Sequence, residues 1–322
     1  MKSFSEKERG CEMTFQNLQS CWHSYTNGKE TPVLFATEED MSFVMNVIAQ
    51  AAFLLIDKVR IIAFTVMNNH LHFILSGSPD SIEEMLRFIS RRLIRAFPFS
   101  ATLNVSHKPI NDLASMRNHI VYVHRNGYVA DHNYTPFSYP WGSGAYYFTP
   151  AALGKPFSEI TSIENRSMFR SRDVKLPSDW QVVGAVTLPY ITGSPVNSAM
   201  MGAQIRAQYI APPSYCDISI GTGMFRDAHQ YFSSVSKNVE AYSGIAVEID
   251  DGEFLPDHEL FAQLLKIVRD KYRLASTKEL TGAQRLDLAR TLHYDYRSSN
   301  GQIRRVLGLS QYDVDSLFPG GK

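Results

Sequence analysis

The spacing of apolar and polar residues predicts alternating strands and helices over the first half of the chain. Residues 21–26 and 59–67 are short apolar runs beside turn residues, which is typical of strands. Between them, apolar residues recur at helical spacing after an acidic start, Glu38 to Asp40, that suits the N-terminal dipole of a helix. Asn68-Asn69 reads as a turn, and "HLHFIL" as the returning strand of a hairpin.

A second helix and a further strand follow. Residues 81–97 are amphipathic, and residues 101–106 are a candidate strand. Residues 111–126 read as a helix that ends at Gly127. The order strand, helix, hairpin, helix, strand, helix predicts an α+β fold. Its form would be a ferredoxin-like split βαβ sandwich, one antiparallel sheet with helices on one face.

The last forty residues show three short helical segments. They cover residues 282–294, 299–307 and 310–318, with "GLS" as the turn between the second and third. This is the pattern of an all-α helix-turn-helix region, in which Arg304 and Arg305 are candidate DNA contacts. The candidate recognition helix carries two aspartates that would repel phosphate. A helical bundle that only packs is therefore an equally good interpretation.

These patterns divide the chain into three parts. We expect an enzymatic domain over residues 1–150 and a helix-turn-helix domain over residues 276–322. Residues 151–275 form a connector that the sequence assigns poorly, apart from amphipathic helices near 224–241 and 257–272.

Composition narrows the class of protein only slightly. The chain has 322 residues and a formal net charge of zero, which counts mildly against a nucleic-acid binder. The N-terminus is charged without an apolar segment behind it, and the longest apolar stretch is too short to span a bilayer. The three scattered cysteines do not suggest a disulfide framework. We expect a cytoplasmic protein that has no membrane partner.

Two histidines stand one residue apart in the hairpin strand. Because side chains alternate along a strand, His70 and His72 should point the same way. Two imidazoles on one rigid face make half of a metal site. The alternative is a pair of ordinary polar residues at a sheet edge.

The helix over residues 111–126 presents a tyrosine and an amide together. Tyr122 and Asn126 are four residues apart and share a face, with His119 beside them. Such a pair can act as nucleophile and metal ligand. Alternatively, the tyrosine packs in the core and the asparagine ends the helix.

Together these motifs resemble a known family. "VMNNHLHFIL", then "YVHRNGYVA" and "YPWGSGAYY", are similar to the single-tyrosine HUH transposases, and most of all to their REP-associated branch. The resemblance covers about residues 15 to 150. Gly127 and Asn68 stand where the family often has proline. The resemblance implies that His70, His72 and Asn126 bind a metal and that Tyr122 is the nucleophile.

The chemistry of these residues is coherent without the family. Nitrogen and oxygen ligands suit Mg²⁺ or Mn²⁺, and such an ion can act as Lewis acid on a phosphodiester. Attack by a tyrosine would give a 5′-phosphotyrosine and a 3′-hydroxyl, and rejoining would need no ATP. The substrate would be single-stranded or hairpin DNA.

Basic residues on the second helix could track such a strand. Arg87, Arg91 and Arg95 recur every four residues, and Arg92 is adjacent. A solvated helix face is an equally good interpretation.

The sequence therefore predicts a metal-dependent enzyme of the HUH tyrosine transposase type that nicks and joins single-stranded DNA. Two alternatives remain open. One is a domesticated or inactive DNA-binding regulator on the same fold, and the other is a metal-dependent hydrolase that uses water in place of Tyr122. The oligomeric state also remains open.

Overall fold

The computed structural model describes most of the chain, with gaps. The described residues are 6–26, 33–97, 104–130, 134–135, 137–148, 180–182, 204–206, 209–237, 239–249, 251, 255, 257–296 and 298–319. The chain divides into two compact units, Met1–Lys237 and Asn238–Lys322, which are described separately.

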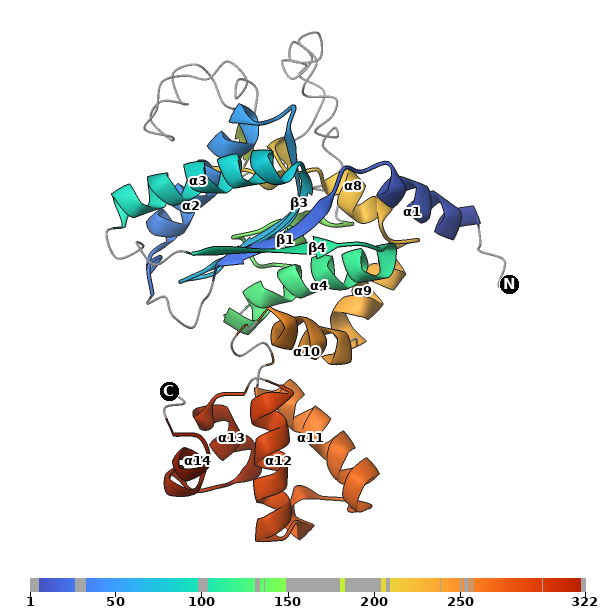
Figure 1. Ribbon diagram of the computed structural model, residues 1–322, viewed down its shortest axis with the longest axis vertical. Helices are drawn as coiled ribbons and strands as arrows, with labels where there is room; N and C mark the ends of the chain where they lie inside the picture. The colour runs from blue at the N-terminus through green and yellow to red at the C-terminus, as the bar shows by residue number, and fades with distance from the viewer. Residues whose placement is uncertain are drawn as a thin grey trace. The chain divides into compact units, whose positions relative to one another are not determined.

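The first unit contains the strands and helices that the first half of the sequence predicts, preceded by a helix, α1, that it does not predict (Figure 1). In chain order they are α1 (Glu6–Gln16), β1 (Cys21–Thr26), α2 (Glu38–Leu54), β2 (Val59–Val66), β3 (Leu71–Gly77), α3 (Pro79–Ala96), β4 (Val105–Ile110) and α4 (Leu113–Ala130). After the short helix η2 (Gly144–Tyr146) come β5 (Trp180–Val182), β6 (Gln204–Arg206), β7 (Tyr209–Ile210), η6 (Pro212–Ser214), α8 (Ile218–Gly223) and α9 (Ala228–Lys237). Strands β5, β6 and β7 form a small second sheet.

The main sheet has the strand order β2-β3-β1-β4, and each neighbouring pair is antiparallel. With α2 and α3 as the connecting helices, this is the order of a ferredoxin-like split βαβ sandwich. The α+β fold class is thus confirmed. The last strand begins later than the sequence suggests, at Val105, and residues 101–103 lie outside the described part.

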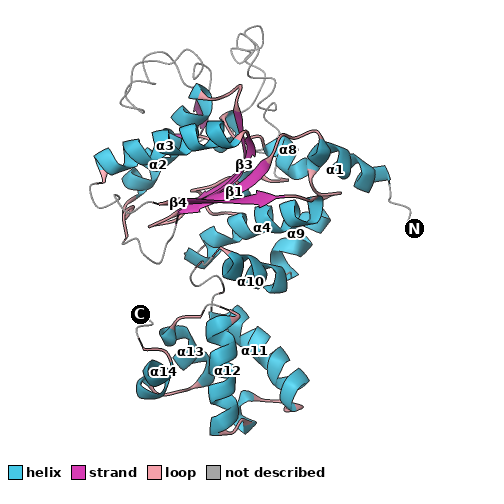
Figure 2. Cartoon of the chain, in the orientation of Figure 1, coloured by secondary structure: helices cyan, strands magenta, loops and turns pink. Residues whose placement is uncertain are grey.

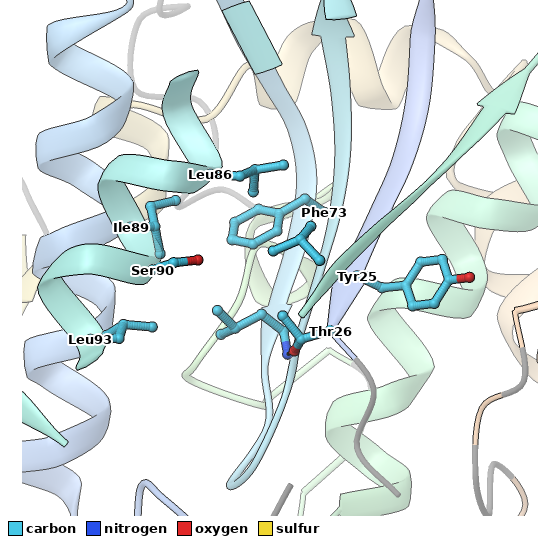
Figure 3. Close-up of a pocket in the computed structure, with 9 residues that line it drawn as sticks. Tyr25, Thr26, Phe73, Leu86, Ile89, Ser90 and Leu93 are labelled. Atoms are coloured by element: carbon cyan, nitrogen blue, oxygen red, sulfur yellow. Dashed lines mark hydrogen bonds between the residues drawn. The ribbon is translucent and has the colours of Figure 1, made fainter. Parts of the chain in front are cut away.

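Helices cover both faces of this sheet, whereas the sequence predicted them on one. Helices α2 and α3 lie together on one face, as expected, and α4 with α9 lies on the other (Figure 2). Figure 3 shows the division at the small cavity under α3: Phe73 points toward Leu86 and Ile89, while Tyr25 points away from them. The reason lies in β2 and β3, which are apolar on both faces and must be buried on both.

Local signals explain where the connecting helices begin. Thr37 caps α2, because its side chain accepts from the Asp40 N–H while Asp40 accepts from the Thr37 N–H at 3.0 Å. Ser78 caps α3, and Pro79 follows at the first helical position, where its missing N–H is harmless.

Gly127 does not end α4, contrary to the prediction, and the helix continues to Ala130. The ring of Tyr139 packs directly on this glycine, so an added Cβ would lie 2.3 Å from Tyr139 Cδ1. The ring is also fixed at its other end, since Tyr139 Oη donates to the Val66 carbonyl at 2.8 Å. The glycine therefore serves close packing rather than a turn.

Substituting Gly127 by alanine should destabilise the first unit by about 1–3 kcal/mol, because the Tyr139 ring cannot move aside. Gly10 is a matched control within α1, since nothing lies within 4 Å of its added Cβ. Gly10→Ala should stabilise by about 0.5–1 kcal/mol. Chemical denaturation of both variants measures the difference, and equal stabilities would contradict this account of Gly127.

The second unit is all α-helical over its described residues. It contains α10 (Val239–Glu248), α11 (Asp257–Tyr272), η7 (Thr277–Glu279), α12 (Gly282–Tyr294), α13 (Asn300–Leu307) and α14 (Gln311–Leu317). The last three helices match the predicted segments to within one residue at each end. Gly308 adopts φ +63°, a left-handed conformation that suits glycine and opens the turn into α14.

The state of the cysteines and the apolar character of the helices can also be described. The three cysteines, Cys11, Cys21 and Cys216, are buried and present as free thiols. In the part of the chain that the structure describes, none of the helices combines the length and apolar character needed to cross a bilayer.

Candidate functional site

The candidate site lies on the sheet face that α4 covers. The His70 and His72 rings are 4.9 Å apart between centroids, and a ring nitrogen of each lies within 4.8 Å of the other. The Tyr122 ring meets the His72 ring edge-on at 5.7 Å. The structure thus brings together His70, which immediately precedes β3, with His72 on β3 and Tyr122 on α4.

Asn126 lies one helical turn beyond Tyr122. His119 contacts His23, which is the strand partner of Ile74, and Tyr122, further along α4, contacts His72. The residue numbers thus rise along α4 while they fall along β3, so the helix runs antiparallel to the strand. Four helical residues advance about 6 Å. Two strand residues advance about 6.6 Å. The displacement from Tyr122 to Asn126 therefore has about the same direction and length as the displacement from His72 to His70.

The Asn126 side chain is available for a further contact. It is buried, and its amide nitrogen has no hydrogen-bond partner among the described residues. A buried amide normally satisfies its hydrogen bonds within the protein. This nitrogen can donate to an added ligand, whereas a metal would bind the side-chain oxygen of Asn126.

A third histidine, His23, lies beside His72, and the sequence did not predict it as a site residue. His23 on β1 is fully buried, with Nε2 3.1 Å from His72 Nδ1 and Nδ1 3.0 Å from His119 Nδ1. Strand alternation places His23 and Tyr25 on one face of β1. Only the register of β1 against β3 shows that this is the face of the histidine pair.

Tyr25 is a second tyrosine at the site. It stands opposite His72 in the β1–β3 register, and its ring stacks on His72 at 6.1 Å with an interplanar angle of 21°. Tyr25 is half-buried, whereas Tyr122 is 1% exposed. Both tyrosines therefore flank His72, from different elements.

The other buried histidines of α4 are held neutral at pH 7. Burial, with a smaller contribution from Lys108, lowers the pKa of His119 to about 4. Burial lowers the pKa of His124 to about 3. His124 is engaged elsewhere, with Nδ1 2.8 Å from Tyr231 Oη and Nε2 2.9 Å from Ser143 Oγ. It therefore does not serve as a base for Tyr122.

The arginines of α3 lie on the opposite face of the sheet from the histidines. Arg87, Arg91 and Arg95 are exposed, and Arg87 forms a 3.3 Å ion pair with Glu83. Arg92 is half-buried and donates to Gln50 Oε1 at 3.1 Å. The structure does not bring this stripe to the candidate site.

Both candidate arginines of the second unit make contacts within it. Arg305 donates to both carboxylate oxygens of Asp257, at 2.5 and 3.0 Å. Arg304 donates to Gln311 across the turn at 2.5 Å. Asp315 on α14 accepts from Gln311 and Asn300, and these hydrogen bonds lower its pKa below the usual range. This aspartate therefore joins α13 to α14.

Comparison with known proteins gives little further information. No family model matches the chain, and no curated protein matches it. One solved structure, a REP-associated tyrosine transposase bound to a REP hairpin, aligns with 44% of this chain and 82% of its own, at 16% identity and a TM-score of 0.30. A score at this level establishes neither a shared fold nor a shared activity.

Proposed function

We propose that the protein is a metal-dependent enzyme of the HUH tyrosine type that nicks and joins single-stranded DNA. One observation carries the proposal: Tyr122 packs against His72, next to His70, on one face of a rigid sheet. A tyrosine nucleophile beside two potential metal ligands can carry out phosphodiester cleavage.

The residues present fit a divalent ion. His70 and His72 offer imidazole nitrogens within 4.8 Å of each other, and the side-chain oxygen of the buried Asn126, one turn from Tyr122, would be the third ligand. These nitrogen and oxygen donors suit Mn²⁺ or Mg²⁺. When bound there, the ion would supply Lewis-acid stabilisation of the charge on the phosphate oxygens.

The chain's own groups carry the covalent step. The Tyr122 hydroxyl oxygen forms a bond to phosphorus while the bond from phosphorus to the 3′ oxygen breaks. The tyrosine proton goes to water, because His124 is engaged with Tyr231 and Ser143 and burial lowers the pKa of His119 to about 4. The departing 3′ oxygen takes up a proton and becomes a hydroxyl. Attack of a 3′-hydroxyl on the phosphotyrosine reverses these steps and joins the strand.

One observation favours the hydrolase alternative, in which water attacks instead. Tyr122 is only 1% exposed, so the DNA must displace part of what covers the ring before its oxygen can reach a phosphate. Water reaches a buried site more easily than a DNA strand does. The two reactions differ in their product, because only attack by tyrosine leaves protein attached to DNA.

Denaturing gel electrophoresis tests the proposal directly. The full chain is incubated with 3′-end-labelled single-stranded and hairpin DNA and Mn²⁺, because the 5′-phosphotyrosine holds the fragment that carries the 3′ end; EDTA is the control. We expect a metal-dependent band in which DNA migrates with protein. Cleaved DNA without this band would support the hydrolase, and binding without cleavage would support the regulator.

We propose that the arginine stripe binds the DNA backbone apart from the chemistry. Replacing Arg87, Arg91 and Arg95 by glutamine should weaken single-strand binding, with a slope against log salt that falls by about 0.7 for each phosphate that is no longer neutralised. Adduct formation at saturating DNA should not change, because the stripe and the histidines lie on opposite faces. Arg9→Gln, an exposed arginine on α1, is the control. An unchanged slope would leave the stripe as a solvated helix face.

We propose that residues 276–322 of the second unit are a helix-turn-helix module in which Arg304 and Arg305 face DNA. His70, His72, Tyr122 and Asn126 all belong to the first unit. A chain that ends at Lys237 should therefore form the adduct with lower DNA affinity, as titration of the adduct against DNA concentration would show. Loss of the adduct from a folded truncated chain would mean that the chemistry needs the second unit.

A further inference from the structure

Three buried imidazoles form a continuous hydrogen-bonded row beside the candidate site. His72 Nδ1 lies 3.1 Å from His23 Nε2, and His23 Nδ1 lies 3.0 Å from His119 Nδ1. The three rings come from β3, β1 and α4 and are at most 2% exposed. Sheet register and helix packing together fix the row.

Proton counting restricts this row to two arrangements. A neutral imidazole carries one N–H, so it donates from one ring nitrogen and accepts at the other. If His72 donates from Nδ1 to His23, then His23 donates from Nδ1 to His119. The His72 lone pair is then on Nε2. In the reverse arrangement His72 carries its proton on Nε2 and cannot bind a metal through that atom.

The tautomer of His70 is determined by a different contact. Its Nδ1 lies 2.6 Å from the side-chain oxygen of Asn69. An amide oxygen only accepts, so His70 must donate from Nδ1, and its lone pair is on Nε2. A metal held by both histidines through Nε2 therefore requires the first arrangement of the row.

We propose that His23 and His119 are positioning residues that keep His72 in the Nδ1–H tautomer before a metal binds. The proposal rests on the metal-binding role assigned above to His72. Partners that fix the second nitrogen of a ligand histidine orient the ring, and their loss typically weakens metal affinity about 10- to 100-fold. Here the partner is another imidazole rather than a carboxylate or carbonyl.

The test reads the tautomer itself in the full chain. Two-bond ¹⁵N–¹H correlation spectra of histidine-labelled, metal-free protein distinguish a proton on Nδ1 from one on Nε2. We expect His72 to carry Nδ1–H. His23→Leu, which removes the acceptor, should move His72 toward Nε2–H and weaken Mn²⁺ binding by calorimetry about 10- to 100-fold. His23→Gln, whose side-chain oxygen can accept from His72, should retain the tautomer and most of the affinity.

Two more variants separate positioning from simple packing. His119→Leu removes only the end of the row and should weaken Mn²⁺ binding less than His23→Leu. His107→Gln is the matched control, because His107 Nδ1 contacts Ser24 Oγ at 3.0 Å and not the row. His107→Gln should change neither the tautomer of His72 nor the Mn²⁺ affinity.

The outcomes separate this inference from the proposed function. An Nε2–H tautomer of His72 in the unmodified chain would overturn the inference, as would equal Mn²⁺ affinity for His23→Leu and His23→Gln. If the tautomer and affinities follow the expectation but no DNA adduct forms, the proposed function fails alone.

Discussion

Replacing Tyr122 by phenylalanine is expected to abolish both the covalent adduct and strand cleavage. The change removes one oxygen and keeps the ring that packs against His72 and His23. Removing one hydroxyl group should cost the folded state only about 1 kcal/mol. Removal of a covalent nucleophile lowers turnover by a factor on the order of 10⁴ or more. Metal and DNA binding should survive, because neither uses the hydroxyl.

Tyr25→Phe is the matched control for this prediction. Tyr25 is a second tyrosine in ring contact with His72, and it is more exposed than Tyr122. If Tyr122 is the nucleophile, Tyr25→Phe retains the adduct on a denaturing gel. Loss of the adduct in Tyr25→Phe together with its persistence in Tyr122→Phe would reverse the assignment. Cleavage without adduct in Tyr122→Phe would favour attack by water.

Local periodicity was sufficient to predict the pairs within one element. His70 and His72 are two residues apart at a strand, and Tyr122 and Asn126 are four apart on a helix. Both relations follow from backbone geometry alone. The order of elements also indicated the α+β sheet, since the signals of β1, α2, the hairpin and α3 are strong.

Long-range relations could not be predicted in the same way. His23 and Tyr25 belong to the site because β1 pairs with β3 in a register that sets Tyr25 opposite His72. No local pattern contains that register. Gly127 was misread because Asn-Gly commonly ends a helix, whereas here the contact with the Tyr139 ring decides. A distant residue overrode the local preference.

The arginine stripe shows a third limit of the sequence. An amphipathic pattern identifies which side of α3 is buried, and Leu86, Ile89 and Leu93 do face the sheet. It does not show which face of the sheet the helix covers. The stripe could therefore be predicted as exposed, but not as lying across the sheet from His70 and His72.

Loss of either paired histidine should abolish cleavage by removing a metal ligand. His70→Ala is the cleaner variant, because His70 immediately precedes β3 and its Nδ1 contacts the adjacent Asn69. His72 is fully buried and hydrogen-bonded to His23, so alanine there leaves a cavity that costs about 2–5 kcal/mol. His72→Gln, which keeps most of the volume, should accompany it.

Calorimetry with Mn²⁺ on the folded variants checks this prediction. His70→Ala and His72→Gln should each lower Mn²⁺ affinity at least about tenfold and abolish the adduct, while single-strand DNA binding by the α3 arginines persists. His124→Gln is the control for loss of a buried histidine, because His124 contacts Tyr231 and Ser143 rather than the pair. It should keep its Mn²⁺ affinity. Unchanged affinity in both His70 and His72 variants would remove the metal from this site, and with it the reason for Tyr122 to be reactive.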